Sequence, residues 1–281
     1  MSNNAHALIK LTSKLYNSPQ LITQDIFAPI LDYLTLRNAG LIEMKTTTKE
    51  APKKPEYVKA SSGKSIGEIQ VSGALTYKPV EMMCAPNGTS YQQLVTDTEQ
   101  LISQGVKTIL YTHASGGGEA AHCFTTANRL RELADANGVT LVTYIDEMSA
   151  SAALALGIIS DHVVIHPSAK TGSIGCVCAV VDRSKALADA GLKPIFISST
   201  AGKTPYQSDG SFSQSFLDNL QAEVTELGNQ FAQHVEKYTG KKKKKVLSLD
   251  AQVFNANRAK ELGLVTAVMN HQEFAEFLAN L

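Results

Sequence analysis

Segments with strand patterns and segments with helix patterns alternate over most of this 281-residue chain, and this alternation strongly limits the folds open to it. The predicted strands are residues 67–73, 106–112, 140–146, 162–166, 173–181, 192–198 and 264–269. The predicted helices are residues 90–104 and 119–137, a segment starting at Ser151, and residues 214–238 and 255–262. Strands separated by helical segments of this length form βαβ units with right-handed crossovers. The sequence therefore predicts an α/β fold with a mainly parallel sheet covered by helices.

The first 64 residues have a different pattern. Two short amphipathic helices are predicted within residues 1–44, and they need a surface to pack on. The apolar positions are Leu8, Leu11 and Leu15 in the first helix, and Ile26, Ile30, Leu34 and Leu36 in the second. Residues 46–64 are rich in Lys, Pro, Thr and Ser without periodicity, which is typical of a linker. We therefore expect a helical N-terminal arm with a flexible linker over residues 1–64 and a second domain over residues 65–281.

Charge and composition indicate no nucleic acid, membrane surface or acidic substrate as a partner. Lys plus Arg equals Asp plus Glu at 26 each, so no overall field attracts a charged partner. The lysines of 241–245 have no interleaved aromatic residues and are expected to form a solvated loop. The four cysteines are too sparse for a disulfide framework or a metal site and are expected to be reduced core thiols.

Targeting signals also bear on the location of the protein. Residues 1–11 lack the uninterrupted apolar segment of a signal peptide. The longest strongly apolar stretch, residues 150–159, is shorter than the roughly 20 residues of a spanning helix. We expect a soluble protein of the cytoplasm.

Ser151 and Lys203 suggest a nucleophile and its base. Ser151 lies between alanines where a predicted apolar strand meets a helix, a position that brings a hydroxyl close to a substrate carbonyl. A serine hydroxyl needs a base to take its proton, and a lysine serves when its amine is neutral, as burial favours. Lys203 follows predicted strand 192–198 and can emerge at a strand end facing inward, but the pattern alone favours a solvated loop lysine.

Two glycine-containing turns complete this constellation. Gly116, Gly117 and Gly118 follow Ser115 and end a predicted strand, so consecutive amides can turn toward one point and bind an oxyanion. A phosphate cradle is the alternative, but neither glycine-rich phosphate motif is present. In the turn 171–175, Ser173 can orient a lysine amine, or the segment is simply a turn.

Histidines offer a different base. A Ser-His-Asp site would combine Ser151 with one of the nearby histidines and with an aspartate, and spacing does not exclude it. The residues concerned are His113, His122, His162, His166, Asp146 and Asp161.

Four motifs in order resemble the Ser/Lys peptidases related to signal peptide peptidase A, and in particular their bacteriophage prohead or capsid-maturation branch. The similarity covers about residues 66–269. The motifs are Ser115-Gly116-Gly117-Gly118-Glu119, Ala150-Ser151-Ala152-Ala153 running to Asp161, Thr171-Gly172-Ser173-Ile174-Gly175, and Ala201-Gly202-Lys203. Residues 14–19 also resemble the short arm of phage members. Two positions depart from the family pattern: Gly116 replaces a proline, and Leu154 stands where an aromatic residue is common.

The resemblance implies roles for these residues. Ser151 would be the nucleophile, Lys203 the general base, Gly117 or Gly118 an oxyanion donor, and Ser173 the residue that positions the lysine. Ser149 competes for the role of nucleophile, but the spacing from Ser151 to Asp161 matches the family. No metal or other cofactor is implied.

The fold implied by the resemblance is that of ClpP-type peptidases and crotonases, built from repeated ββα units and assembled into rings or stacked oligomers. In some members the dyad is completed across a subunit boundary. A homo-oligomeric serine endopeptidase that processes scaffold and capsid precursors within an assembling prohead in the host cytoplasm is thus expected. The alternatives are peptide degradation of the signal-peptide-peptidase type, a crotonase-like acyl-CoA enzyme, and a noncatalytic assembly protein.

Overall fold

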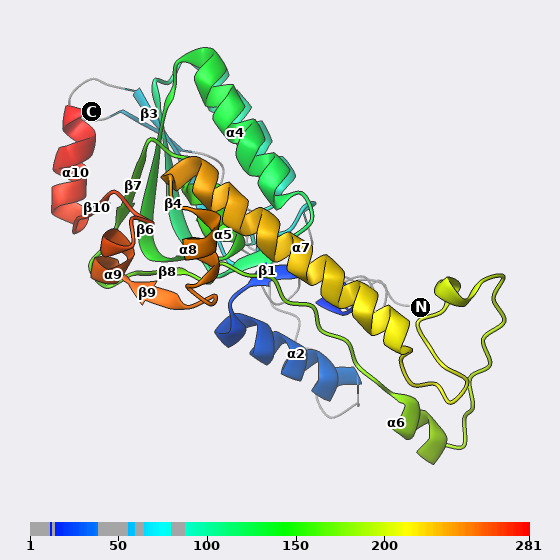
Figure 1. The fold of residues 1–281 in the computed structure, drawn as a ribbon. Coiled ribbons are helices and arrows are strands. Elements are labelled where there is room, and N and C mark those ends of the chain that lie inside the picture. Colours follow the sequence, from blue (N-terminus) through cyan, green and yellow to red (C-terminus); the bar gives the residue numbers. More distant parts are fainter. Residues whose placement is uncertain (1–11, 13–14, 39–55, 60–64, 80–87) are drawn as a thin grey trace.

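The computed structural model describes residues 12, 15–38, 56–59, 65–79 and 88–281, and its centre is a twisted sheet (Figure 1). The described residues form an eight-stranded sheet with the order β10-β7-β6-β4-β3-β2, in which β8 also pairs with β6, and β9 pairs with β8. The strands of this sheet are β2 (Glu56–Lys59), β3 (Ser65–Ser72), β4 (Thr108–Ser115), β6 (Thr140–Ala150), β7 (His162–Ile165), β8 (Lys170–Gly172), β9 (Val253–Asn255) and β10 (Ala267–Val268). All pairings are parallel except β2–β3 and β8–β9. The predicted α/β class with a mainly parallel sheet is confirmed.

Helices cover both faces of the sheet (Figure 1). The longer elements are α2 (Gln24–Asn38), α3 (Tyr91–Ser103), α4 (Cys123–Asn137), α7 (Gln214–Thr239) and α10 (His271–Asn280). The shorter ones are α5 (Ala152–Gly157), α6 (Ser184–Asp189), η1 (Ala201–Lys203), α8 (Lys243–Leu247) and α9 (Ala256–Glu261). On one face, Phe274 of α10 stacks on Tyr144 of β6 with ring centroids 4.0 Å apart.

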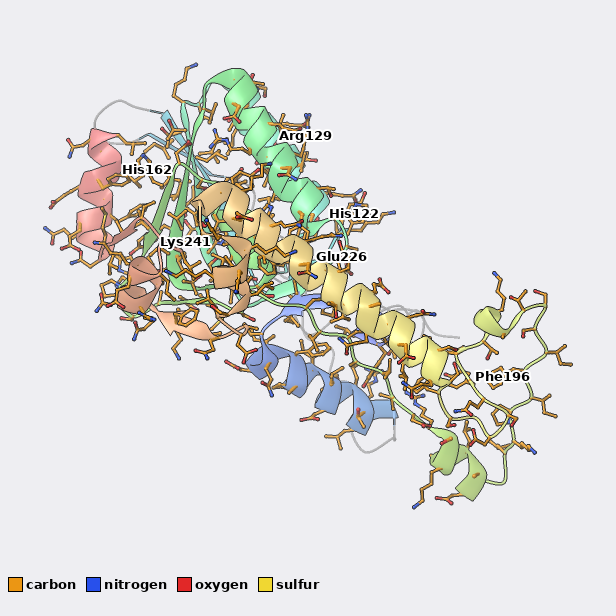
Figure 2. All side chains as sticks on the ribbon, in the orientation of Figure 1. His122, Arg129, His162, Phe196, Glu226 and Lys241 are labelled. Carbon is orange, nitrogen blue, oxygen red and sulfur yellow. The ribbon has the colours of Figure 1, made fainter. Side chains whose placement is uncertain are left out.

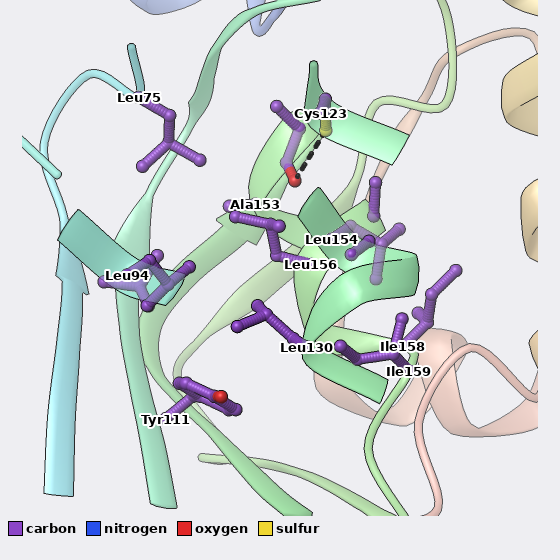
Figure 3. Close-up of a cluster of buried hydrophobic side chains, with 14 of the residues drawn as sticks. Leu75, Leu94, Tyr111, Cys123, Leu130, Ala153, Leu154, Leu156, Ile158 and Ile159 are labelled. Atoms are coloured by element: carbon purple, nitrogen blue, oxygen red, sulfur yellow. Dashed lines mark hydrogen bonds between the residues drawn. The ribbon is translucent and has the colours of Figure 1, made fainter. Parts of the chain in front are cut away.

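The main core lies on the opposite face, around the short helix α5. Every residue of α5 is buried. Leu130 of α4 and Tyr111 of β4 belong to the same apolar cluster (Figure 3). The Cys123 thiol donates to the Ala152 carbonyl oxygen at 3.7 Å, which ties the start of α4 to the start of α5. The residue just before α5 is therefore held on a densely packed base.

Local signals fix several predicted helices. Ser90 caps α3 by accepting from the Gln93 amide, and Asn255 caps α9 by accepting from the Arg258 amide. Helix α7 also forms as predicted. Helix α10 was not predicted; it begins at a capping box between Asn270 and Glu273.

Other predicted elements are wrong in part. The predicted helix 119–137 begins only at Cys123, because Gly117–Glu119 forms strand β5 and pairs with β1 (Gln20–Ile22). The predicted strand 173–181 contributes only single bridges at Val177 and Ala179 in the described structure. The lysine run 241–245 is not a loop throughout, because α8 starts at Lys243 and packs against α7.

The predicted strand 192–198 is also wrong. Residues 180–213, here called the arm, extend away from the sheet and carry α6 and η1 (Figure 1). Residues 192–198 are irregular within the arm, because no described strand lies beside them. Aromatic rings at Phe196, Tyr206, Phe212 and Phe216 stack in succession and join the arm to the start of α7.

The N-terminal region is described only in part. The second predicted helix corresponds to α2, whereas the first lies mostly outside the described residues. Most of the predicted linker 46–64 also lies outside them, and residues 56–59 form β2. The domain boundary near residue 65 stays a prediction.

Candidate active site

Ser151 lies where β6 ends and α5 begins, in a backbone conformation that is unusual for serine. Its φ is 55° and its ψ is −121°. A non-glycine residue with positive φ is uncommon, and such strain is concentrated at functional sites. The surrounding bonds hold this conformation: the Ser151 amide donates to the Gly172 carbonyl at 2.9 Å, and its carbonyl accepts from the Ala155 amide at 3.0 Å. The side chain is fully buried, and its hydroxyl has no hydrogen-bond partner among the described residues.

The glycine loop lies against this serine. Gly117 has a φ of 105°, and a β-carbon added there would be 3.0 Å from the Ser151 β-carbon, so only glycine fits. The Gly117 amide donates to the Ser115 hydroxyl at 3.1 Å. The Gly117 carbonyl and the Glu119 amide both bind Leu75. Backbone polar groups alternate in direction along a strand, so the amide and carbonyl of Gly118 point the opposite way, toward β1.

Ser173 lies beside Ser151, as the motif order suggests. Strands β6 and β8 pair in parallel with Ala150 opposite Gly172, so the serines that follow these residues lie at adjacent strand ends. Ser173 is buried, has a φ of 55°, and donates from its amide to the Gln252 carbonyl at 2.8 Å. The structure thus brings Ser151, Gly117, Gly118 and Ser173 into one region.

Lys203 is not part of that region within this chain. It ends η1 on the arm, where it is exposed. The predicted strand that was to carry it inward is absent from the described structure, since residues 192–198 are irregular. Figure 2 shows the nearby Phe196 at the far end of α7, away from the sheet. In a single copy of the chain, Ser151 therefore has no lysine from this motif beside it.

Of the candidate histidines, His113 contacts a serine, but that serine is Ser149. The His113 Nδ1 and the Ser149 hydroxyl are 2.8 Å apart, and both residues are buried. Burial lowers the pKa of His113 to about 3, so the ring is neutral at physiological pH. The Ser149 carbonyl accepts a 2.5 Å hydrogen bond from the Thr171 hydroxyl.

The other histidines and aspartates of the alternative triad have separate partners. His122 stacks on Tyr77, and the His162 ring lies edge-on to Phe277. Asp146 accepts from His271, whose ring lies 4.6 Å from that of His166. Asp161 accepts from Arg131 at 3.0 Å and from the Leu141 amide at 2.8 Å. These contacts tie loops and helix ends together rather than forming a Ser151 triad.

Residues 134–281 match the sequence profile of peptidase family S49, and this segment is more than half of the chain. The chain belongs to peptidase family S49. The matched segment contains Ser151, Ser173 and Lys203, whereas the glycine loop precedes it.

Two curated phage proteins are similar to this S49 chain. The capsid assembly protease C of Escherichia phage lambda is 25% identical over 240 residues, which are 85% of this chain and 54% of that protein. The head-tail preconnector protein GP5 of Enterobacteria phage P21 is 25% identical over 215 residues, which are 76% of this chain and 42% of that protein. The chain thus spans about half the length of the curated relatives that it matches.

Solved structures similar to the S49 chain include two peptidases. A mutant of ClpP1 from Listeria monocytogenes has a TM-score of 0.46 at 11% identity, covering 73% of this chain and 94% of that one. A peptidase from Plasmodium falciparum has a TM-score of 0.42 at 10% identity, covering 72% of this chain and 95% of that one.

Three features of the candidate site were not predicted. The Ala152 amide begins α5 and belongs to the helix-start amides that lack an acceptor within the helix, so it is a second candidate oxyanion donor. Its position directly after the proposed nucleophile is a sequence signal for that role. The Thr171 hydroxyl bond to Ser149 and the pairing of β1 with β5 have no comparable local signal.

Neither a metal centre nor a spanning helix is found in the part of the chain that the structure describes. No three His, Cys, Asp or Glu side chains there are grouped so that they could bind a metal ion. Each helix within those residues is too short or too polar to cross a membrane.

Proposed function

We propose that this chain is a serine endopeptidase with Ser151 as its nucleophile. The observation that carries the proposal is the strained Ser151 backbone at the β6–α5 junction, directly against Gly117. This arrangement sets the hydroxyl at the start of a buried helix, beside amides suited to a developing oxyanion. Membership of peptidase family S49 supports the same chemistry.

The proposed reaction has two stages. Ser151 Oγ attacks a peptide carbonyl carbon, and its proton passes to the Lys203 amine. The Gly118 and Ala152 amides stabilise the oxyanion, because the Gly117 amide already donates to the Ser115 hydroxyl, and Ser173 orients the lysine. The C–N bond then breaks, and the departing amine takes the proton from Lys203. In the second stage, water attacks the acyl-enzyme with Lys203 again accepting a proton, which releases the acid and restores the Ser151 hydroxyl.

We infer that Lys203 acts on Ser151 of a neighbouring copy. A lysine exposed to water is protonated at neutral pH and is no base, whereas burial favours the neutral amine. Lys203 is exposed on the arm, which also presents bare apolar side chains at Leu192, Ile195 and Ile197. Exposed apolar surface of this kind is typical of an interaction site. Docking of the arm on a second copy would bury both features at once.

Helix α7 supports the same assembly. Its apolar stripe is fully buried only near the C-terminal end, at Phe231 and Val235. The stripe residues nearer the arm, Phe216, Leu220 and Val224, are only half-buried. The arm and the first half of α7 therefore form one continuous surface available to a homo-oligomer.

The proposed substrates are scaffold or capsid precursors. The proposed location is the assembling prohead in the host cell. The similarity to a phage capsid assembly protease and to a phage head-tail preconnector protein supports this choice. Incubating wild-type protein and Ser151→Ala with the candidate precursors, followed by mass spectrometry of new termini, tests it. Cleavage by the wild type alone is expected. If the precursors stay intact while an unrelated peptide is cleaved, general peptide degradation is favoured instead.

Mixing two inactive variants tests the shared dyad. Ser151→Ala and Lys203→Ala are each expected to lose peptidase activity and labelling by a fluorophosphonate. In an equal mixture, about a quarter of the sites combine an intact serine with a neighbour's intact lysine, so activity should return to that extent. Lys193→Ala, which removes another exposed lysine of the arm, is the matched control and should stay active.

The mixture also separates the competing explanations. Lys203 in the same chain as its serine would leave the mixture as inactive as its components. A wild-type oligomer that neither labels at Ser151 nor cleaves peptides would contradict the peptidase and favour a noncatalytic assembly protein.

A further inference from the structure

Strand β1 lies in the place that a bound peptide would take beside the candidate nucleophile. On one side, Gln20–Ile22 pairs antiparallel with Gly117–Glu119 of the glycine loop, with Leu21 opposite Gly118. On the other side, Gln20 exchanges two backbone hydrogen bonds with Val177, at 2.7 and 3.0 Å. An extended segment that adds to a strand edge through its main chain is a common mode of peptide recognition.

The segment also covers Ser151. A β-carbon at Gly117 would overlap the Leu21 carbonyl oxygen and lie 3.0 Å from the Ser151 β-carbon, so the Leu21 carbonyl and the serine side chain both lie next to Gly117. Leu21 and Ser151 both have 0% of their surface exposed. A nucleophile in this state is closed to any other peptide.

Contacts after β1 keep the segment on the loop. The Thr23 amide donates to the Gly116 carbonyl at 2.9 Å. A β-carbon at Gly116 would overlap Ile26 Cδ1 of α2 and lie 2.9 Å from the Thr23 hydroxyl. The absence of a side chain at Gly116 is therefore what lets the N-terminal segment lie so close to the loop.

The partner on the other side of β1 leads directly into the arm. Besides the Gln20–Val177 bonds, the Asn17 amide donates to the Ala179 carbonyl at 2.9 Å. Residues 177 and 179 come just before the arm that carries Lys203. The chain segment that holds the N-terminal strand is thus continuous with the one proposed to dock on a neighbouring copy.

We propose that residues 19–23 are an internal pseudosubstrate, which fills the peptide-binding position until assembly of the arm releases it. This inference rests on the proposed peptidase function. In the single chain the Leu21–Ile22 bond is not cut, because Lys203 is not at Ser151. Protein substrates then enter by replacing β1 between Gly117–Glu119 and Val177.

The reactivity of a thiol at position 151 tests whether residues 19–23 cover this position, and the test does not rely on catalysis. The test uses full-length Ser151→Cys that also carries Ile195→Asp and Ile197→Asp, so that the arm does not dock on a second copy. Alkylation by N-ethylmaleimide is followed by mass spectrometry of the peptide that contains position 151. Adding Gln20→Pro removes the donor to Val177, and adding Gly116→Ala introduces the β-carbon that would clash with Ile26. Each should accelerate alkylation roughly tenfold or more, because the closed state must otherwise open first. Gln24→Pro, at the first position of α2 where proline is tolerated, is the control and should leave the alkylation rate unchanged.

In a Ser151 background with the wild-type arm, and at a concentration where assembly is incomplete, the same two changes should raise the peptidase activity of the full chain, because they weaken the closed state that assembly must open. Circular dichroism establishes whether each variant is folded. If Gln20→Pro does not fold, Gly116→Ala still decides the test. Equal alkylation rates in all folded variants would contradict the proposal that residues 19–23 cover position 151. A wild-type protein whose N-terminus is Ile22 would show that the strand is cleaved as a substrate and is not an inhibitor. Faster alkylation without peptidase activity in any variant would uphold the cover and contradict the proposed function.

Discussion

Nδ1 of His113 lies 2.8 Å from the hydroxyl of Ser149, two positions before the proposed nucleophile. A neutral histidine beside a serine is the usual composition of a catalytic pair. This one lies in the core, since a β-carbon at Gly157 of α5 would be 3.2 Å from the His113 ring. Neither side chain is exposed. We interpret the pair as a packed polar contact that joins β4 to β6.

Replacing Ser149 separates the two serines. Ser149→Ala should lower the free energy of unfolding by about 1–3 kcal/mol, because it leaves the buried His113 nitrogen without its partner. Fluorophosphonate labelling of Ser151 should persist in this variant. Ser151→Ala should abolish labelling and preserve the fold. Urea unfolding and intact-protein mass spectrometry measure both effects, and loss of the adduct in folded Ser149→Ala with an adduct retained in Ser151→Ala would reverse the assignment.

The strained backbone of Ser151 predicts a stability difference between two inactive variants. At a φ of 55°, glycine is relieved of the strain that alanine keeps, so Ser151→Gly should be more stable than Ser151→Ala by about 1 kcal/mol. Thermal unfolding provides the comparison. The same pair of changes at Ser149, within strand β6, is the control: there alanine should be the more stable. If alanine is the more stable variant at both positions, the Ser151 conformation stores no strain.

Much of the sheet was predictable because its signals are local. β-Branched runs define β4 and β6, and caps at Ser90 and Asn255 mark helix starts. The site was predictable to the extent that small residues recur at strand ends, as at Ser151. The position of the arm was not, because apolar residues 192–198 match a strand pattern whether or not a partner strand exists. Pairing of β1 with β5 was missed because the partners are far apart in sequence.

Two buried histidines predict loss of stability in mild acid. Burial lowers the pKa of His113 to about 3 and that of His234 to about 4, below the ordinary value near 6.5. From about pH 6.5 down to these values the unfolded chain binds protons that the folded chain does not. The free energy of unfolding should therefore fall with pH, by up to about 1.4 kcal/mol per pH unit for each histidine.

His234→Gln tests this dependence. His234 Nε2 donates to the Ala155 carbonyl at 2.8 Å, and a glutamine can still donate without titrating. Urea unfolding at pH 5 and pH 8 should show a smaller loss of stability in the variant than in the wild type. Measurement at pH 8, where both histidines are neutral, isolates the cost of the substitution itself. An unchanged pH slope would mean that His234 is protonated equally in both states.

The exposed apolar residues of the arm predict assembly through this surface. Ile197 is 97% exposed and Ile195 81%, so replacing them removes few contacts within one chain. Ile195→Asp together with Ile197→Asp should leave the free energy of unfolding of the isolated chain within about 0.5 kcal/mol of the wild type, as at other surface positions. The same change should dissociate the oligomer, because charges at an apolar interface lose their water. Sedimentation velocity measures the shift, and Leu247→Asp, at an exposed leucine on α8, is the matched control that should keep the wild-type mass.

Since Lys203 is proposed to reach Ser151 only between copies, dissociation should also remove labelling of Ser151, and a fully labelled monomer would contradict the shared site.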